Sequence, residues 1–214
     1  MHNPWRQKTN QGRSLLKDYI FFPMILCLAV LLVGLALRTS GDDLPTGSVS
    51  GANTNYRVIR VDGEDLNRFD AGEEAVRFLR RSESDPVLVV RATADEFPGS
   101  PDAGPHFRLA ADLQTAFSGR QVRVNIRARS AEVDGAKALE IAYMAGPEGR
   151  TRWQRFNLND KFSNYAFNFN VPVAQFEQGF DFVGIRPVIN PGETSIEIES
   201  LTLVNLSLWR QAAF

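Results

Sequence analysis

Apolar and polar side chains alternate in short segments along the chain from Tyr56 onward. The clearest example is Gln121 to Arg129, in which Val, Ile and Ala alternate with Arg and Asn. A period of two is typical of a strand that buries one face. Residues 86–92 are apolar at nearly every position, which predicts a strand buried on both faces. The remaining predicted strands cover residues 57–61, 106–109, 138–143, 152–158, 164–171, 182–189 and 195–208.

Turn residues separate these segments, and little helix is predicted. Asn190-Pro191-Gly192 predicts a hairpin-type turn between the last two strands. Residues 75–80 fit either a strand or a short helix, and Ala111 to Phe117 has the propensity for one or two helical turns. About nine short strands with turn signals between them predict an all-β fold, an antiparallel β-sandwich or jelly roll, over residues 56–208.

A different pattern covers Tyr19 to Leu37, which contains no charged residue. A helix of this length matches the thickness of the bilayer's hydrocarbon core, so residues 19–38 are expected to be a single transmembrane helix. The preceding residues 1–18 are expected to form a cytoplasmic tail, because basic residues resist translocation. The basic residues of this segment are Arg6, Lys8, Arg13 and Lys17. A cleaved signal peptide is the alternative, since Gly34-Leu35-Ala36 has the small-x-small pattern that signal peptidase accepts.

Two further segments complete the expected organisation. Residues 39–55 are rich in Gly, Ser, Thr and Asn and are predicted to be a flexible linker. Residues 209–214 are expected to be a C-terminal tail. Amphipathic aromatic side chains settle at membrane or partner interfaces, which makes Trp5, Trp209 and Phe214 candidates for such contacts.

The amino-acid composition limits the cellular compartment, the kinds of metal site and the partners that are expected. Cys27 is the only cysteine, so the chain has neither an intramolecular disulfide nor a cysteine-based metal site. An extracytoplasmic domain without disulfides is common in bacterial envelopes, which favours the inner membrane with a periplasmic C-terminal domain. The net charge of −1 argues against nucleic acid as a partner.

Residues that suggest catalysis or a metal site are few. His2 and His106 are the only histidines, which argues against a histidine triad or a zinc site. Glu197 and Glu199 fit a solvated strand face better than the paired carboxylates of a glycosidase. The acidic residues between 62 and 70 fit a turn and lack EF-hand spacing, which leaves calcium binding open. No cofactor is expected, and the chain is not expected to be an enzyme.

Four segments in the second half follow an order that resembles a known group. They are Gly119–Arg129, Trp153–Phe156, Tyr165–Pro172 and Ile196–Leu203. The order is similar to that in the jelly-roll carbohydrate-binding modules, also called galactose-binding-domain-like, over roughly residues 104–206. The resemblance implies a β-sandwich and, as an expectation, binding of a glycan without catalysis.

Alternation also predicts which polar side chains share a surface. We hypothesise that one sheet face presents an exposed tryptophan among guanidinium and amide groups. The residues are Trp153, Arg127, Arg155, Asn157, Arg129 and Asn168. Such a face suits an acidic glycan, because the ring stacks on C–H groups while amide and guanidinium groups donate to hydroxyls and carboxylates. The alternative is that Trp153 belongs to the core and the polar side chains form an ordinary solvated face.

Two interpretations of function outweigh a third, an enzyme on a β-sandwich, which only scattered carboxylates support. The first is a membrane-anchored, non-catalytic module in the bacterial envelope that binds an acidic polysaccharide. The second is an accessory subunit of a larger membrane protein complex, which uses the sandwich and the helix for protein contacts. In both, the lipid bilayer is a partner through Tyr19 to Leu37.

Overall fold

The computed structural model describes residues 23–32, 44–80, 86–146, 149–174 and 179–207. The chain divides into two compact units, residues 1–43 and 44–214. In the first unit, residues 23–32 are helical. Within the described residues, no helix has both the length and the apolar character that crossing a bilayer requires. The rest of the segment from Tyr19 to Leu37 lies outside the described residues, so the transmembrane helix stays a prediction.

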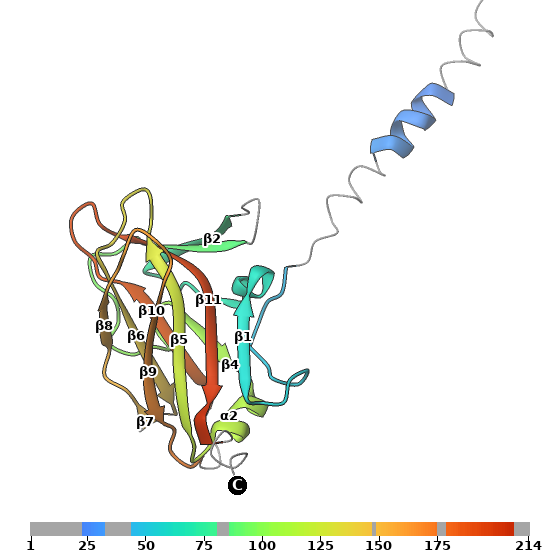
Figure 1. Cartoon of the computed structure of the whole chain (residues 1–214). Helices are drawn as coiled ribbons and strands as arrows, with labels where there is room; N and C mark the ends of the chain where they lie inside the picture. The colour runs from blue at the N-terminus through green and yellow to red at the C-terminus, as the bar shows by residue number, and fades with distance from the viewer. Residues whose placement is uncertain (1–22, 33–43, 81–85, 147–148, 175–178, 208–214) are drawn as a thin grey trace, which may run out of the picture. The chain divides into compact units, whose positions relative to one another are not determined.

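The second unit consists of two antiparallel sheets (Figure 1). The six-stranded sheet has the order β2-β3-β11-β5-β9, and β1 also pairs with β11. The five-stranded sheet has the order β4-β10-β6-β7, and β8 also pairs with β6. The strands of the six-stranded sheet are β1 Val58–Asp62, β2 Ala75–Arg80, β3 Val87–Ala92, β5 Gln121–Ser130, β9 Ser163–Asn170 and β11 Ser195–Asn205. Those of the five-stranded sheet are β4 His106–Leu109, β6 Ala138–Ala145, β7 Gly149–Arg150, β8 Gln154–Asn157 and β10 Asp181–Pro187.

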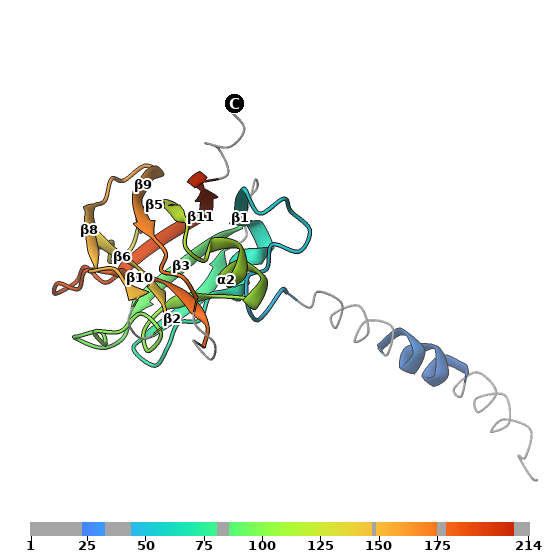
Figure 2. The ribbon, with the colours of Figure 1, turned by 90° about the horizontal axis from the view of Figure 1, so that it is seen from below.

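The core lies between the two sheets and follows the alternation in the sequence. On β5, the buried side chains are Val122, Val124, Ile126 and Ala128. Residues 111–117 form helix α2, Ala111–Phe117, which adds Leu113 and Phe117 to the core near the start of β5 (Figure 2). The β-sandwich is confirmed, and so are a short helix at 111–117 and a β3 that is buried along most of its length.

Three local predictions differ in part from the structure. The predicted hairpin-type turn forms, because Asn190 and Glu193 exchange backbone hydrogen bonds of 3.1 and 2.9 Å, but the strands on either side, β10 and β11, belong to different sheets. The acidic residues between 62 and 70 were expected in a turn, and most of this segment is a 3₁₀ helix, η1 Gly63–Arg68. The described part of the predicted linker, residues 44–55, belongs to the sandwich unit.

Val49 shows how that segment is held. Its side chain is 4% exposed, and its backbone forms a parallel bridge with Leu109 of β4. Its amide donates to Arg108 O over 2.8 Å, and its carbonyl accepts from Ala110 N over 2.8 Å. Burial and backbone pairing of Val49 therefore help to fix the start of the domain, which composition alone did not reveal.

Candidate functional site

The outer face of the five-stranded sheet, which is turned away from the core, carries a shallow depression. On β10, Val183 and Ile185 point into the core, so Phe182, Gly184 and Arg186 point outward. Gly184 lies opposite Ala142 of β6 in the strand register. Two of the smallest residues thus meet at the centre of this face, and they leave room for a large side chain from elsewhere.

Trp153, the residue before β8, fills this space. A methyl group added at Gly184 would lie 2.7 Å from Cη2 of the indole, so the ring sits directly on this glycine. The guanidinium carbon of Arg186 lies 3.9 Å from the ring centroid, a cation–π contact. The indole Nε1 donates to Gly99 O over 3.0 Å. Trp153 is half-buried, so the ring is fixed in place and still reaches solvent.

Arg186 is itself held from two sides. It donates to a carboxylate oxygen of Glu140 over 2.9 and 2.8 Å and to Pro98 O over 2.8 Å. Phe97 contributes a second aromatic ring, 5.7 Å from the guanidinium carbon. The loop that precedes β4 is therefore tied to the sheet, and the indole needs little further ordering when a ligand arrives.

A hollow of about 550 Å³ opens beside the indole. Its lining is Gly99, Ser100, Arg150, Thr151, Arg152 and Trp153, here called the Trp153 hollow. The Thr151 hydroxyl accepts from Tyr143 N over 2.9 Å and keeps its own hydrogen for donation. The guanidinium groups of Arg150 and Arg152 have no hydrogen-bond or ion-pair partner among the described residues. An aromatic ring, hydroxyls and unpaired guanidinium groups are the groups that recognise a sugar carrying negative charge.

The predicted site residues fall on two opposite faces of the sandwich. Arg155 and Asn157 lie on β8 and share the outer face of the five-stranded sheet with Trp153. Arg127, Arg129 and Asn168 lie on β5 and β9 of the six-stranded sheet, facing away from the core. The prediction that all six share one surface was wrong. Alternation separates inside from outside within each strand but does not say which sheet a strand joins.

The guanidinium groups of Arg127 and Arg129 are engaged in ion pairs with carboxylates and do not form a surface of free donors. Arg127 pairs with Glu199, and Arg129 donates to Glu197 over 2.8 Å and to Glu132 over 3.0 Å. Burial alone lowers the pKa of the Arg129 guanidinium, but the hydrogen bonds and negative charge of these two carboxylates outweigh burial and raise it. Both guanidinium groups also lie near the Phe162 ring.

Glu197 differs most from its prediction. It was expected on a solvated face, yet its side chain is 2% exposed, and Arg80 and Arg129 each donate to it over 2.8 Å. Glu199 lies at a β-bulge between Ile198 and Ser200, so it has no partner in the β5 ladder, whereas Glu197 pairs with Arg129. The two carboxylates are thus engaged by different arginines, which favours a structural role over paired catalysis.

The residues that sequence reasoning missed lie in loops, except Arg150, which ends β7. Arg150, Thr151 and Arg152 come just before Trp153, and Gly99 and Ser100 lie in the loop between β3 and β4. In the sequence, the tripeptide Thr151-Arg152-Trp153 was the signal that could have identified some of these residues. Trp5, Trp209 and Phe214 lie outside the described residues.

The other described side chains that could ligate a metal or titrate are either far apart or buried. Across the described residues, no three His, Cys, Asp or Glu side chains are grouped to hold a metal ion. Tyr143 donates to Asp181 over 2.9 Å in the interior. Burial raises the pKa of Asp181, although hydrogen bonds from Tyr143 and Gln114 oppose the rise. Burial, together with the charge of Asp181, raises the pKa of Tyr143.

The chain matches no protein-family model and no curated protein. Among solved structures, it is similar to the N-terminal CBM22-1–CBM22-2 tandem domain of Xyn10C from Paenibacillus barcinonensis. The identity is 11% and the TM-score 0.51, over 72% of this chain and 50% of that one. The likeness shows a shared β-sandwich fold. It is also similar to the CBM22-2 xylan-binding domain of the same protein (11% identity, TM-score 0.47, 69% and 98% coverage) and to the xylan-binding module CBM15 (19%, 0.43, 69% and 95%).

Proposed function

We propose that this chain is a non-catalytic carbohydrate-binding module that binds an acidic polysaccharide of the bacterial envelope through the Trp153 hollow. The observation that carries the proposal is the fixed, half-buried indole beside a free hydroxyl donor and two guanidinium groups that have no partner among the described residues. A rigid aromatic ring offers contact area to a sugar at low entropic cost, and the arginines favour a ligand with carboxylate groups. The fold is shared with a tandem of carbohydrate-binding modules, which is consistent with such a role.

The test compares polysaccharide binding by the full-length chain and two variants, in buffer containing a mild detergent throughout. Trp153→Ala is expected to weaken binding of polygalacturonate by about tenfold or more, since it removes the ring's burial and stacking. Phe78→Ala is the matched control, because Phe78 is an exposed aromatic (49%) on the six-stranded sheet. Calorimetry with polygalacturonate and with neutral xylan gives the affinities. Unchanged affinity in Trp153→Ala, with the fold intact by circular dichroism, would refute the proposal.

The anchor is part of the same proposal. We infer that Tyr19 to Leu37 holds the module at the inner membrane with the sandwich in the periplasm, and the uncharged run and its basic flank support this. Residues 23–32, the part that is described, are helical. Immunoblotting of membrane fractions tests it: loss of about 4 kDa, a mass estimated from the length of a membrane-spanning run, would show a cleaved signal peptide. Stoichiometric co-purifying proteins without polysaccharide binding would favour an accessory subunit instead.

A further inference from the structure

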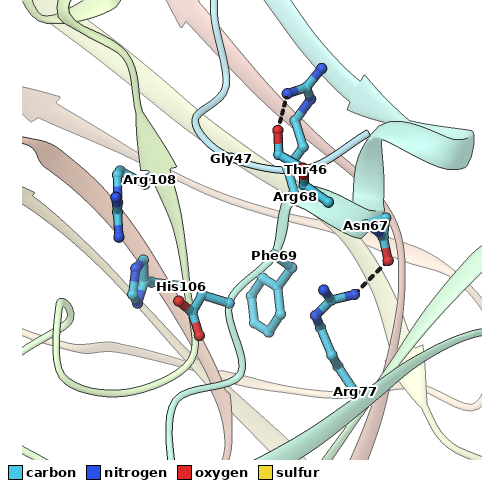
Figure 3. Close-up of a pocket in the computed structure, with 9 residues that line it drawn as sticks. Thr46, Gly47, Asn67, Arg68, Phe69, Arg77, His106 and Arg108 are labelled. Carbon is cyan, nitrogen blue, oxygen red and sulfur yellow. Dashed lines mark hydrogen bonds between the residues drawn. The ribbon is translucent and has the colours of Figure 1, made fainter. Parts of the chain in front are cut away.

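A second pocket shares no lining residue with the Trp153 hollow. It lies where η1 and the start of β2 meet the edge strand β4, and its volume is about 260 Å³ (Figure 3). Polar groups around it come from Asn67, Arg68, Asp70, Arg77, His106 and Arg108, here called the arginine pocket. Phe69 lies between Arg77 on one side and His106 and Arg108 on the other.

Positive charge exceeds negative charge in this pocket. Arg68 is already engaged, since it donates to Asp65 over 2.9 Å and to Thr46 O over 2.8 Å. Among the described residues, the Arg77 guanidinium has only the neutral Asn67 as a partner, and the Arg108 guanidinium has only the Phe180 ring. Asp70 is the single carboxylate in the lining. Two guanidinium groups are therefore left without a negative partner, unlike Arg127 and Arg129 on the six-stranded sheet.

The Arg77 side chain and the backbone of β4 near Arg108 are held in place before any ligand binds. Arg77 donates to the Asn67 amide oxygen over 2.6 Å, and the Asn67 amide nitrogen donates to Pro45 O over 3.2 Å. Asp70 and His106 exchange two backbone hydrogen bonds of 2.8 Å, which fix the start of β4, the strand that contains Arg108. A preorganised guanidinium group loses less conformational freedom on binding, so more of the free energy of its hydrogen bonds to an anion contributes to affinity.

His106 supplies a second, independent indication of a ligand. Its side chain is buried, and Nδ1 lies 2.7 Å from Gly104 O, so Nδ1 carries the hydrogen. Nε2 is buried and has no partner among the described residues. A buried nitrogen that lacks a partner costs free energy, and a hydroxyl donor in the adjoining pocket would offset the cost.

We propose that the arginine pocket binds a single acidic sugar residue, with its carboxylate between Arg77 and Arg108. A carboxylate matches the planar fork of a guanidinium, and the sugar hydroxyls supply the donors that a simple anion lacks. The volume of about 260 Å³ lies just below the roughly 300 Å³ at which ordinary ligand pockets begin, which suits a ligand the size of one monosaccharide. The site is independent of the Trp153 hollow and does not require it.

An NMR titration of the full-length chain in detergent tests the site with glucuronate, glucose, acetate and inorganic phosphate. Glucuronate is expected to bind saturably at one site and at least about tenfold more tightly than glucose, which lacks the charge, or acetate, which lacks hydroxyls. Glucose binding as tightly as glucuronate would overturn the proposal. Phosphate binding more tightly than glucuronate would also overturn it, by assigning the pocket to a phosphate group.

Variants locate the binding and separate it from the proposed polysaccharide site. Arg108→Gln and Arg77→Gln are each expected to weaken glucuronate binding by about tenfold or more, because each removes a charge-assisted hydrogen bond. Arg108 is exposed, so its variant is expected to fold even if Arg77→Gln does not. Arg123→Gln, an exposed arginine of the other sheet, is the control. Equal affinity in Arg108→Gln and Arg123→Gln would refute the site. Trp153→Ala is expected to leave glucuronate binding unchanged, so each proposal can fail without the other.

Discussion

Gly184 determines whether Trp153 can occupy its place on the sheet, so Gly184→Ala is the sharpest test of the candidate site. The added methyl would lie 2.7 Å from indole Cη2, 3.2 Å from Cζ3 and 2.9 Å from Pro101 Cβ. Carbon atoms in contact normally lie about 3.5–4.0 Å apart. The ring or the backbone beneath it must therefore move by about 1 Å, the difference between these distances.

Two consequences follow from this displacement. Overpacking of this kind costs about 1–3 kcal/mol of unfolding free energy, which corresponds to a lower Tm by roughly 2–12 °C for a domain of this size. The shift also disturbs the contact with Arg186 at 3.9 Å and the hydrogen bond to Gly99 at 3.0 Å. We expect polysaccharide affinity to fall by about tenfold, or about 1.4 kcal/mol, although no group that contacts the ligand has been removed.

The measurements are urea unfolding, calorimetry with polygalacturonate, and the NMR signal of the Trp153 indole N–H, identified from a Trp153→Phe variant. Loss of the hydrogen bond to Gly99 is expected to shift this signal and to speed its exchange with solvent. Gly104→Ala is the matched control, because its new methyl would lie 3.8 Å from Pro98 Cδ, an ordinary contact. If Gly184→Ala matched Gly104→Ala in stability, affinity and indole signal, the reasoning about this face would be refuted.

Three further predictions concern stability. Glu197→Gln is expected to lower the unfolding free energy by about 2 kcal/mol, less than the roughly 3–5 kcal/mol of a fully buried pair because both guanidinium groups are partly exposed. Urea unfolding should show a smaller loss in Glu199→Gln, and equal losses would contradict this. Asp181 has a raised folded-state pKa, so its contribution to stability falls as pH rises from the ordinary value of about 3.9 to the folded value. The unfolding free energy of Asp181→Asn minus that of the wild type should therefore grow across this range and then level; a difference independent of pH would refute the assignment. Val49→Ala should cost roughly 2 kcal/mol by urea unfolding, whereas a flexible linker would show no loss.

The sequence determined most of the secondary structure and much of the core. The alternation from Gln121 to Arg129 predicted β5 and its buried side chains, because the two-residue period is a local property of an extended chain. The same reasoning placed Trp153, Arg155 and Asn157 on the outer side of their strand, opposite Phe156. These statements need only the direction of successive side chains, which neighbouring residues fix.

Only the tertiary structure decided which outer faces are shared. Whether Trp153 meets Arg127 or Arg186 depends on which sheet each strand joins, and hydrogen bonds between segments far apart in the chain settle that. The same holds for Glu197, which is buried because β11 lies between arginines of β2 and β5. Both the Trp153 hollow and the arginine pocket are lined from several segments far apart in the sequence. The period of a strand is local, but a binding surface arises from the pairing of distant strands, and pairing is a property of the whole chain.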